Sequence, residues 1–149
     1  MQVKDIMTNK VVTASPSMKI NEVAHLLTGY RIHGVPVVDE ENKLVGIVTE
    51  TDFFVTDSPD LYLPSYINFL NDTKMKGEIN SAQKEKVKEL LGASAKDIMT
   101  TECFTFSPET EIEEVVAVFQ KKELHTVPVV GKDGKLAGII TVADIIKLI

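Results

Sequence analysis

The sequence predicts an α+β protein made of two similar βαββα units that pack sheet to sheet with pseudo-twofold symmetry, plus a helical insertion between them. Three observations lead to this prediction. The phrase GIVTETD at 46–52 returns as GIITVAD at 138–144. A shift of 92 positions aligns residues 3–52 with 95–144 without a gap, and 22 of the 50 aligned residues are identical. Within each copy the hydrophobic spacing changes between that of a strand and that of a helix.

The first unit begins with a short strand and a helix. Residues 11–14 form a β-prone run, which Pro16 ends. Apolar residues then recur on one helical face, and Gly29 is expected to stop that helix. The residues of this face are Ile20, Val23, Ala24 and Leu27.

A hairpin and a second, short helix complete the unit. Residues 34–38 and 44–48 are unbroken apolar runs joined by a polar link, which predicts two buried strands. Pro36 has no N–H to donate, so its strand should lie at a sheet edge or leave that position unpaired. The short helix should begin near Thr49.

The second unit repeats this order, and its hairpin carries Asp133-Gly134, a strong turn signal. Its strands and first helix are expected near 103–106, 111–122, 127–130 and 135–140, with a last helix from Thr141. One such unit alone could hardly bury enough apolar surface to be stable. The two units are therefore expected to pack against each other.

The stretch between the units matches neither of them. Tyr62, Tyr66, Phe69 and Leu70 stand at helical spacing, and residues 80–91 predict a further helix. The predicted domains are repeat 1 at 1–54, a helical insertion or linker at 55–93, and repeat 2 at 94–149.

Composition narrows the possible function classes. The longest apolar runs are about five residues, too short to span a bilayer. A formal charge of −6 disfavours a broad nucleic-acid surface, because phosphate binding requires a basic face. The amino terminus lacks an apolar signal core, and the single Cys103 has no internal disulfide partner. We therefore expect a cytoplasmic protein with no membrane or nucleic-acid partner.

The repeated closing motif has two interpretations. Gly46 interrupts an apolar strand, which marks a bulge or a place where something approaches the backbone closely. Thr49 stands where a helix start favours an anion, and Asp52 can accept two hydrogen bonds from a ribose. The same Thr-x-x-Asp spacing is close to a capping box, which stabilises a helix start without any ligand. The residues alone favour neither interpretation.

Taken together, the motifs resemble a tandem cystathionine-β-synthase (CBS) domain pair, or Bateman module, standing alone. The resemblance rests on the leading D-I-M-T, the V-P-V-V after a helix and the closing G-h-h-T-x-x-D, where h is hydrophobic, and it covers 1–54 and 93–149. It implies clefts between the repeats that hold an adenosine-containing ligand: AMP, ADP, ATP or S-adenosylmethionine. It implies no required cofactor, and Mg²⁺ only as a companion of the ligand.

The resemblance also assigns ligand contacts to matching positions. Thr49, Asp52, Thr141 and Asp144 would serve phosphate and ribose. Residues near D-I-M-T and the first strand would flank the base; they are Ile6, Met7, Thr13, Ile98, Met99 and Thr105. Residues at the V-P-V-V strand would wall the pocket; they are His33, Val35, Pro36, His125, Val127 and Pro128.

Two basic positions need separate comment. His33 and His125 are either phosphate ligands or surface histidines at a helix–strand joint, and no second His or Cys at ligand spacing makes them a metal site. Arg31 has Glu123 as its counterpart, which predicts clefts of unequal phosphate affinity.

Three functions are compared. The first is a non-catalytic, homodimeric sensor that binds the adenosine ligand and, having no attached effector domain, signals to a partner protein. The alternative is a ligand-free interaction or scaffold module that acts through the helical insertion. An enzyme with Asp52 or Asp144 as base is disfavoured, because the sequence shows no nucleophile motif and no metal cluster. We therefore expect neither catalytic residues nor a metal site.

Overall fold

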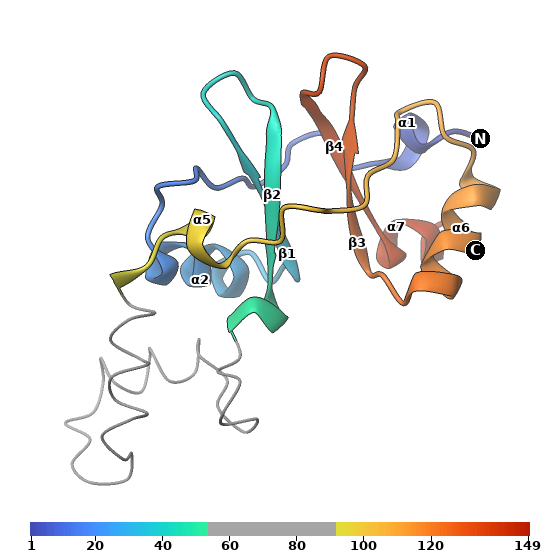
Figure 1. Ribbon diagram of the computed structural model, residues 1–149. Helices are drawn as coiled ribbons and strands as arrows, with labels where there is room; N and C mark the ends of the chain where they lie inside the picture. Colours follow the sequence, from blue (N-terminus) through green and yellow to red (C-terminus); the bar gives the residue numbers. More distant parts are fainter. Residues whose placement is uncertain (54–91) are drawn as a thin grey trace, which may run out of the picture.

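The computed structural model describes residues 1–53 and 92–149, which form two similar halves (Figure 1). The helices predicted within 55–93 fall on 54–91, outside the described residues. The first half contains α2 (Ile20–Gly29), β1 (Gly34–Val38), β2 (Leu44–Thr49) and the short 3₁₀ helix η1 (Glu50–Phe53). The second half contains α6 (Ile112–Lys122), β3 (Thr126–Val130), β4 (Leu136–Thr141) and α7 (Val142–Ile146). Two four-residue helices, α1 (Val3–Ile6) and α5 (Ala95–Ile98), precede the halves in sequence.

Each half is built on one antiparallel hairpin. β1 pairs with β2 from Gly34 opposite Thr49, and β3 pairs with β4 in the same register from Thr126 opposite Thr141. One apolar face of α2 covers the first hairpin, and all four residues predicted for that face are buried. The mixed fold with two small antiparallel sheets is therefore confirmed.

The predicted first strand of each unit is reduced to a single bridge. Ala14 bridges Val37 in parallel, with its N–H donating to the Pro36 carbonyl at 2.9 Å. The next bond of this ladder would need an N–H at Pro36, which proline lacks. Phe106 and Pro128 repeat the arrangement in the second half. Pro36 thus lies in an edge strand, as predicted, paired with Ile47 on one side and offering no N–H to residue 12 on the other.

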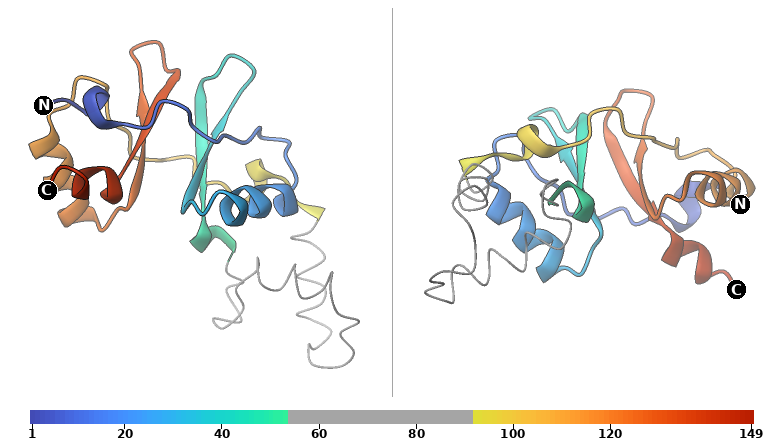
Figure 2. Two further views of the ribbon diagram at one scale, coloured as in Figure 1. Left: turned by 180° about the vertical axis from the view of Figure 1, so that it is seen from behind. Right: turned by 60° about the horizontal axis from the view of Figure 1, so that its bottom comes forward.

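The opening segments of the two repeats are exchanged between the halves. α1 lies beside α6 in the second half, whereas α5 lies beside α2 in the first (Figures 1 and 2). The Val3 N–H donates to the Thr110 carbonyl at 2.9 Å, and its counterpart, the Ala95 N–H, donates to the Met18 carbonyl at 2.8 Å. Each half is therefore completed by residues that belong, in sequence, to the other repeat.

The exchange continues into the hairpins. Thr8 and Ile139 form two backbone hydrogen bonds, of 2.9 and 3.0 Å, so that residue 8 adds a bridge to the edge of β4. Thr100 and Ile47 form the same pair of bonds on β2. The recurrence of these contacts at a spacing of 92 residues is the structural form of the pseudo-twofold symmetry.

Each half has its own hydrophobic core, and each core includes one residue from the exchanged segment. The first core consists of Ala14, Ile20, Val23, Ala24, Leu27, Val35, Val37, Val48, Phe53 and Ala95. The second consists of Val3, Phe106, Ile112, Val115, Phe119, Val127, Val129 and Ile140. Val3 and Ala95 are completely buried, so the exchange contributes to the core of both halves.

The glycine of the repeated motif is explained by this exchange. A Cβ at Gly138 would lie 2.6 Å from the Met7 sulfur and 2.9 Å from the Thr8 carbonyl oxygen. A Cβ at Gly46 would meet Met99 and Thr100 at 2.6 and 3.0 Å. The close approach predicted for the glycine is therefore made by the D-I-M-T segment of the other repeat.

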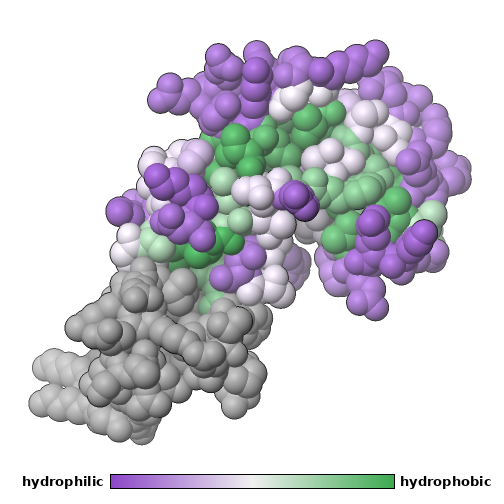
Figure 3. Space-filling model, in the orientation of Figure 1, coloured by the Kyte–Doolittle hydropathy of each residue, from purple (hydrophilic) through white to green (hydrophobic). Residues whose placement is uncertain are grey.

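The halves also touch through their hairpins. Near the turns, the Leu44 N–H donates to the Gly134 carbonyl at 3.2 Å, and the Leu136 N–H donates to the Asn42 carbonyl at 3.0 Å. At the opposite end of the strands, a Cβ at Gly34 would lie 3.6 Å from Thr126 Cγ2. In Figure 3 the turns are hydrophilic, whereas apolar residues gather over the strands below them.

Helix ends differ in one respect from the prediction. Gly29 is the last residue of α2, but the left-handed residue beyond the helix is Arg31, with φ of 53°. Glu123 holds the equivalent position after α6 with φ of 52°.

Among the residues that the structure describes, no helix is long and apolar enough to cross a membrane.

The Gly–Met contact gives a test of the exchange. Gly138→Ala should lower the free energy of unfolding by about 1–3 kcal/mol, because the backbone of Thr8 cannot move away as a flexible side chain would. Chemical denaturation measures this value. Gly29→Ala is the control, since a Cβ placed there would have nothing within 4 Å. Because alanine favours a helix over glycine by up to about 1 kcal/mol, this variant should not be destabilised. Equal stability of the Gly138 variant and the unchanged protein would contradict the packing described.

Candidate functional site

Two hollows lie between the halves and share a wall formed by His33, His125 and Thr126. The first, here called the Asp144 cleft, has a volume of about 440 Å³. It is lined by Thr8, Lys10, Val11, Val12, Arg31, Ile32, His33, Gly34, His125, Thr126, Ile139, Thr141, Val142, Ala143, Asp144 and Lys147. The second, the Thr49 cleft, has about 470 Å³ and is lined by His33, Thr49, Glu50, Thr51, Glu123, Leu124, His125 and Thr126.

The exchange of segments produces the Asp144 cleft. After Thr8 bonds to β4, the chain has to cross from the second half back to the first. Residues 10–12 make this crossing and form one side of the cleft. The junction between β4 and α7 and the loop between α2 and β1 form the remaining sides. An occupant of this cleft would therefore touch both halves at once.

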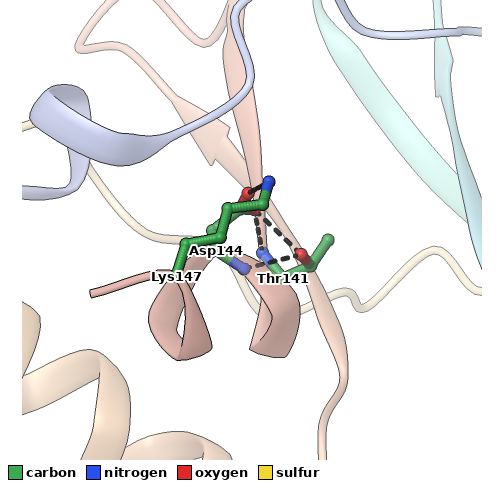
Figure 4. A network of polar contacts seen from close by, with 3 residues as sticks. All are labelled: Thr141, Asp144 and Lys147. Atoms are coloured by element: carbon green, nitrogen blue, oxygen red, sulfur yellow. Dashed lines mark hydrogen bonds and ion pairs between the residues drawn. The ribbon is translucent and has the colours of Figure 1, made fainter. Parts of the chain in front are cut away.

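Thr141, Asp144 and Lys147 form a polar network at the cleft (Figure 4). The backbone N–H and the hydroxyl of Thr141 donate to Asp144 Oδ2 at 2.9 and 2.8 Å. The Asp144 N–H donates back to Thr141 Oγ1 at 3.3 Å, which completes a capping box at the start of α7. Lys147 Nζ donates to the other carboxylate oxygen, Oδ1, at 3.2 Å.

The first copy of the motif is less completely bonded. The Thr49 N–H donates to Asp52 Oδ2 at 2.7 Å, and the Thr49 hydroxyl lies 3.3 Å from the same oxygen. That hydroxyl also lies 2.9 Å from the Thr51 hydroxyl. The second copy thus forms the complete capping box, whereas the first shows only the bonds that Thr49 donates to Asp52. The ligand role of the two aspartates stays a prediction.

The two clefts differ in charge at equivalent positions. Lys10 and Arg31 line the Asp144 cleft, and residues 102 and 123, their counterparts 92 positions on, are both glutamates. Val142 of the Asp144 cleft corresponds to Glu50 of the Thr49 cleft. The Glu50 carboxylate lies 3.1 Å from His33 Nδ1 on the shared wall.

The structure brings five of the predicted ligand residues to these clefts. His33, His125, Thr141 and Asp144 line the Asp144 cleft, and Thr49 lines the other with the two histidines. The rest lie elsewhere. Ile6, Met7, Ile98 and Met99 pack against the hydrophobic cores, and Val35 and Val127 are members of those cores. Pro36 and Pro128 are buried in strands, and Asp52 bonds to the Thr49 N–H at the start of η1. Thr13 borders a separate shallow hollow, and Thr105 is exposed. Their ligand roles stay predictions.

Lys10 and Lys147 line the Asp144 cleft although the sequence motifs did not point to them. The repeat alignment does contain a signal for Lys10, because this basic residue is aligned with Glu102 just as Arg31 is aligned with Glu123. Lys147 lies beyond the aligned segment, and only the turn of α7 brings it to Asp144. Within 1–53 and 92–149, no group of three or more His, Cys, Asp or Glu residues is placed to hold a metal ion.

Comparison with known proteins decides the family. Residues 3–56 and 95–149 match the sequence model of the CBS domain. The chain belongs to the CBS domain family. Its tandem matches coincide with the two sequence repeats, whose opening segments are exchanged between the halves.

CBS-domain relatives of several kinds are similar over nearly the whole chain. The uncharacterized protein MJ1426 of Methanocaldococcus jannaschii is 31% identical over 99% of this chain and 90% of its own length. The chloroplastic CBS domain-containing protein CBSX1 of Arabidopsis thaliana is 31% identical over 97% of this chain and 62% of its length. Inosine-5'-monophosphate dehydrogenase of Aquifex aeolicus is 30% identical over 91% of this chain, which spans only 22% of that enzyme.

Solved structures agree in fold. The CBS domain pair of protein MJ0100, in complex with 5'-methylthioadenosine and S-adenosyl-L-methionine, is 26% identical, covers 99% of this chain and 94% of its own, and has a TM-score of 0.68. A putative acetoin utilization protein (AcuB) from Vibrio cholerae is 26% identical, with coverage of 99% and 89% and a TM-score of 0.72. The structure of CBSX2 in complex with AMP has the same TM-score at 23% identity, over 99% of this chain and 94% of its own, and shows the fold alone.

The capping box at α7 gives a stability prediction. Thr141→Ala removes the hydroxyl that bonds to Asp144 and should cost about 1 kcal/mol of unfolding free energy. Thr141→Ser keeps the hydroxyl and should lose only a fraction of that. Both values come from thermal or chemical unfolding without ligand. A serine variant as unstable as the alanine variant would mean that the methyl group, not the cap, is what matters.

Proposed function

We propose that this chain is a non-catalytic regulatory module that binds an adenosine-containing ligand between its CBS repeats and signals occupancy to a partner protein. One observation carries the proposal: the Asp144 cleft is lined by both halves and by the segment that crosses between them. A ligand bound there would fix the position of one half relative to the other. The complex of MJ0100 with S-adenosyl-L-methionine and 5'-methylthioadenosine supports adenosine as the common part of the ligand.

Asp144 is the proposed ribose-binding residue. Its Oδ2 is held by Thr141, which fixes the direction of the carboxylate. Among the residues that the structure describes, Lys147 alone bonds to its Oδ1, and the Lys147 side chain is 74% exposed. A ribose hydroxyl can take the place of the ammonium at Oδ1, because Lys147 is free to turn toward solvent or toward a phosphate. Capping and ligand binding are thus compatible in one carboxylate.

A ligand-free scaffold that acts through residues 55–93 is the alternative. Nearly all of that segment lies outside the described residues, so no contact in the structure favours it. Ligand binding is preferred because the Asp144 cleft exists and carries convergent polar side chains. We also propose that the protein works in the reducing interior of the cell, which its single cysteine suits.

Nucleotide titration with thermal unfolding tests the function. One of AMP, ADP, ATP, S-adenosylmethionine or 5'-methylthioadenosine, at 100 times its dissociation constant, should add roughly 2.7 kcal/mol to the unfolding free energy. Asp144→Asn should weaken that ligand about ten- to a hundredfold, because a charged acceptor for hydroxyl groups is lost.

Asp52→Asn is the matched variant in the other repeat. Because Asp52 lines neither cleft, this variant should weaken the ligand much less than Asp144→Asn, and an equal or larger loss would assign the ligand to the first copy of the motif. If none of the five compounds shifts the unfolding transition at millimolar concentration, the sensor proposal is wrong and the scaffold alternative stands.

Association into a homodimer is part of the proposal. Several large apolar side chains are exposed, among them Tyr30 at 63%, Ile146 at 60% and Ile149 at 105% of their reference areas. Contact between two copies would remove part of this surface from water. Light scattering at micromolar concentration should give twice the chain mass of 16.5 kDa, and Ile146→Asp should shift the species toward the monomer. A single 16.5 kDa species for the unchanged protein would contradict the dimer.

A further inference from the structure

From the charges of the two clefts we infer that the Asp144 cleft selects a phosphate-bearing, anionic adenosine ligand over S-adenosylmethionine, and that the Thr49 cleft rejects such an anion. This inference rests on the proposed function and names the ligand class of the same site. Lys10 and Arg31 are its specificity-determining residues.

The Asp144 cleft offers cationic groups that nothing in the described chain neutralises. Lys10 and Arg31 line it, are both exposed, and form no ion pair within 1–53 and 92–149. The one carboxylate among the lining residues, Asp144, is 6% exposed and already carries Lys147. A phosphate near Lys10 and Arg31 would therefore find donors that need not give up another partner.

The same charges disfavour a cationic ligand. S-adenosylmethionine carries a sulfonium, an ammonium and a carboxylate group next to its adenosine. Its net charge is positive, and the sulfonium beside the ribose would face Lys10 and Arg31 where a nucleotide places its phosphate. Adenosine and 5'-methylthioadenosine are neutral and would gain nothing from Lys10 or Arg31. Because guanidinium groups bind phosphate oxygens in a bidentate manner, Arg31 should contribute more than Lys10.

The Thr49 cleft shows the opposite charge on the same scaffold. Glu50 and Glu123 line it, where Val142 and Arg31 stand in the Asp144 cleft. His33, on the shared wall, has its Nδ1 directed to Glu50 at 3.1 Å rather than toward the other hollow. A phosphate placed there would be repelled by two carboxylates. The two clefts should therefore differ in phosphate affinity although the same fold forms both.

The repeat supplies a conservative way to reverse the charge. Arg31 has φ of 53°, a left-handed conformation that many substitutions would strain, but Glu123 holds φ of 52° at the equivalent position. Arg31→Glu therefore places a residue that this fold already accepts there. Lys10→Glu has the same precedent in Glu102.

Isothermal titration of the full chain with ATP, ADP, AMP, adenosine, 5'-methylthioadenosine and S-adenosylmethionine tests the inference. The nucleotides should bind most tightly, with one site per chain, and Arg31→Glu should weaken them about ten- to a hundredfold. Adenosine and 5'-methylthioadenosine should lose less than threefold. Raising the salt concentration should weaken ATP but not adenosine, because ionic screening acts only on the charged ligand.

Lys132→Glu is the matched control, since it makes the same charge change in the β3–β4 turn, away from both clefts. If this variant loses as much ATP affinity as Arg31→Glu, the net charge of the protein, not the position of Arg31, explains the loss. That result would overturn the inference. Binding of S-adenosylmethionine as tight as that of any nucleotide would also overturn it, while leaving the adenosine-sensor proposal intact. If no adenosine compound binds, the proposed function itself fails, and tripolyphosphate binding that requires Arg31 would then assign the cleft to phosphate alone.

Discussion

The packing of each D-I-M-T segment against the hairpin of the other repeat is the contact on which the rest of the structure depends. It fixes the backbone of residues 8 and 100 at the sheet edges, places Val3 and Ala95 in the opposite cores, and requires glycine at positions 46 and 138. A hairpin covered by a single helix would leave part of its core exposed. The exchange covers that part and makes the two halves inseparable.

The same exchange explains where the clefts lie and why they differ. The chain must cross between the halves after leaving the partner sheet, and residues 10–12 line the Asp144 cleft as they cross. Lys10 and Arg31 are exposed, and neither belongs to a hydrophobic core. Charge could therefore change sign at positions 10 and 31 relative to Glu102 and Glu123 without disturbing either core.

Local patterns predicted the helices and hairpins, because apolar spacing is read within a few residues of chain. The same patterns overestimated the strands at 11–14 and 103–106, since the loss of pairing comes from prolines more than 20 residues away. Gly46 and Gly138 indicated a close approach, but spacing alone could not say that Met99 and Met7 make it. For the site, the contrast of Arg31 with Glu123 predicted unequal clefts, whereas the contribution of Lys147 depends on a turn of α7 and could be found only in three dimensions.

The exchange also has a consequence for how the chain is made. During synthesis residues 1–8 leave the ribosome long before their binding partners at 108–112 and 138–140. The first repeat likewise waits for residues 93–100 before its core is closed. Contacts of such long sequence separation make folding slow and leave apolar surface open in the meantime. The first half of the nascent protein can therefore close once residues 93–100 have emerged, whereas the second half waits for β4 and stays open longer.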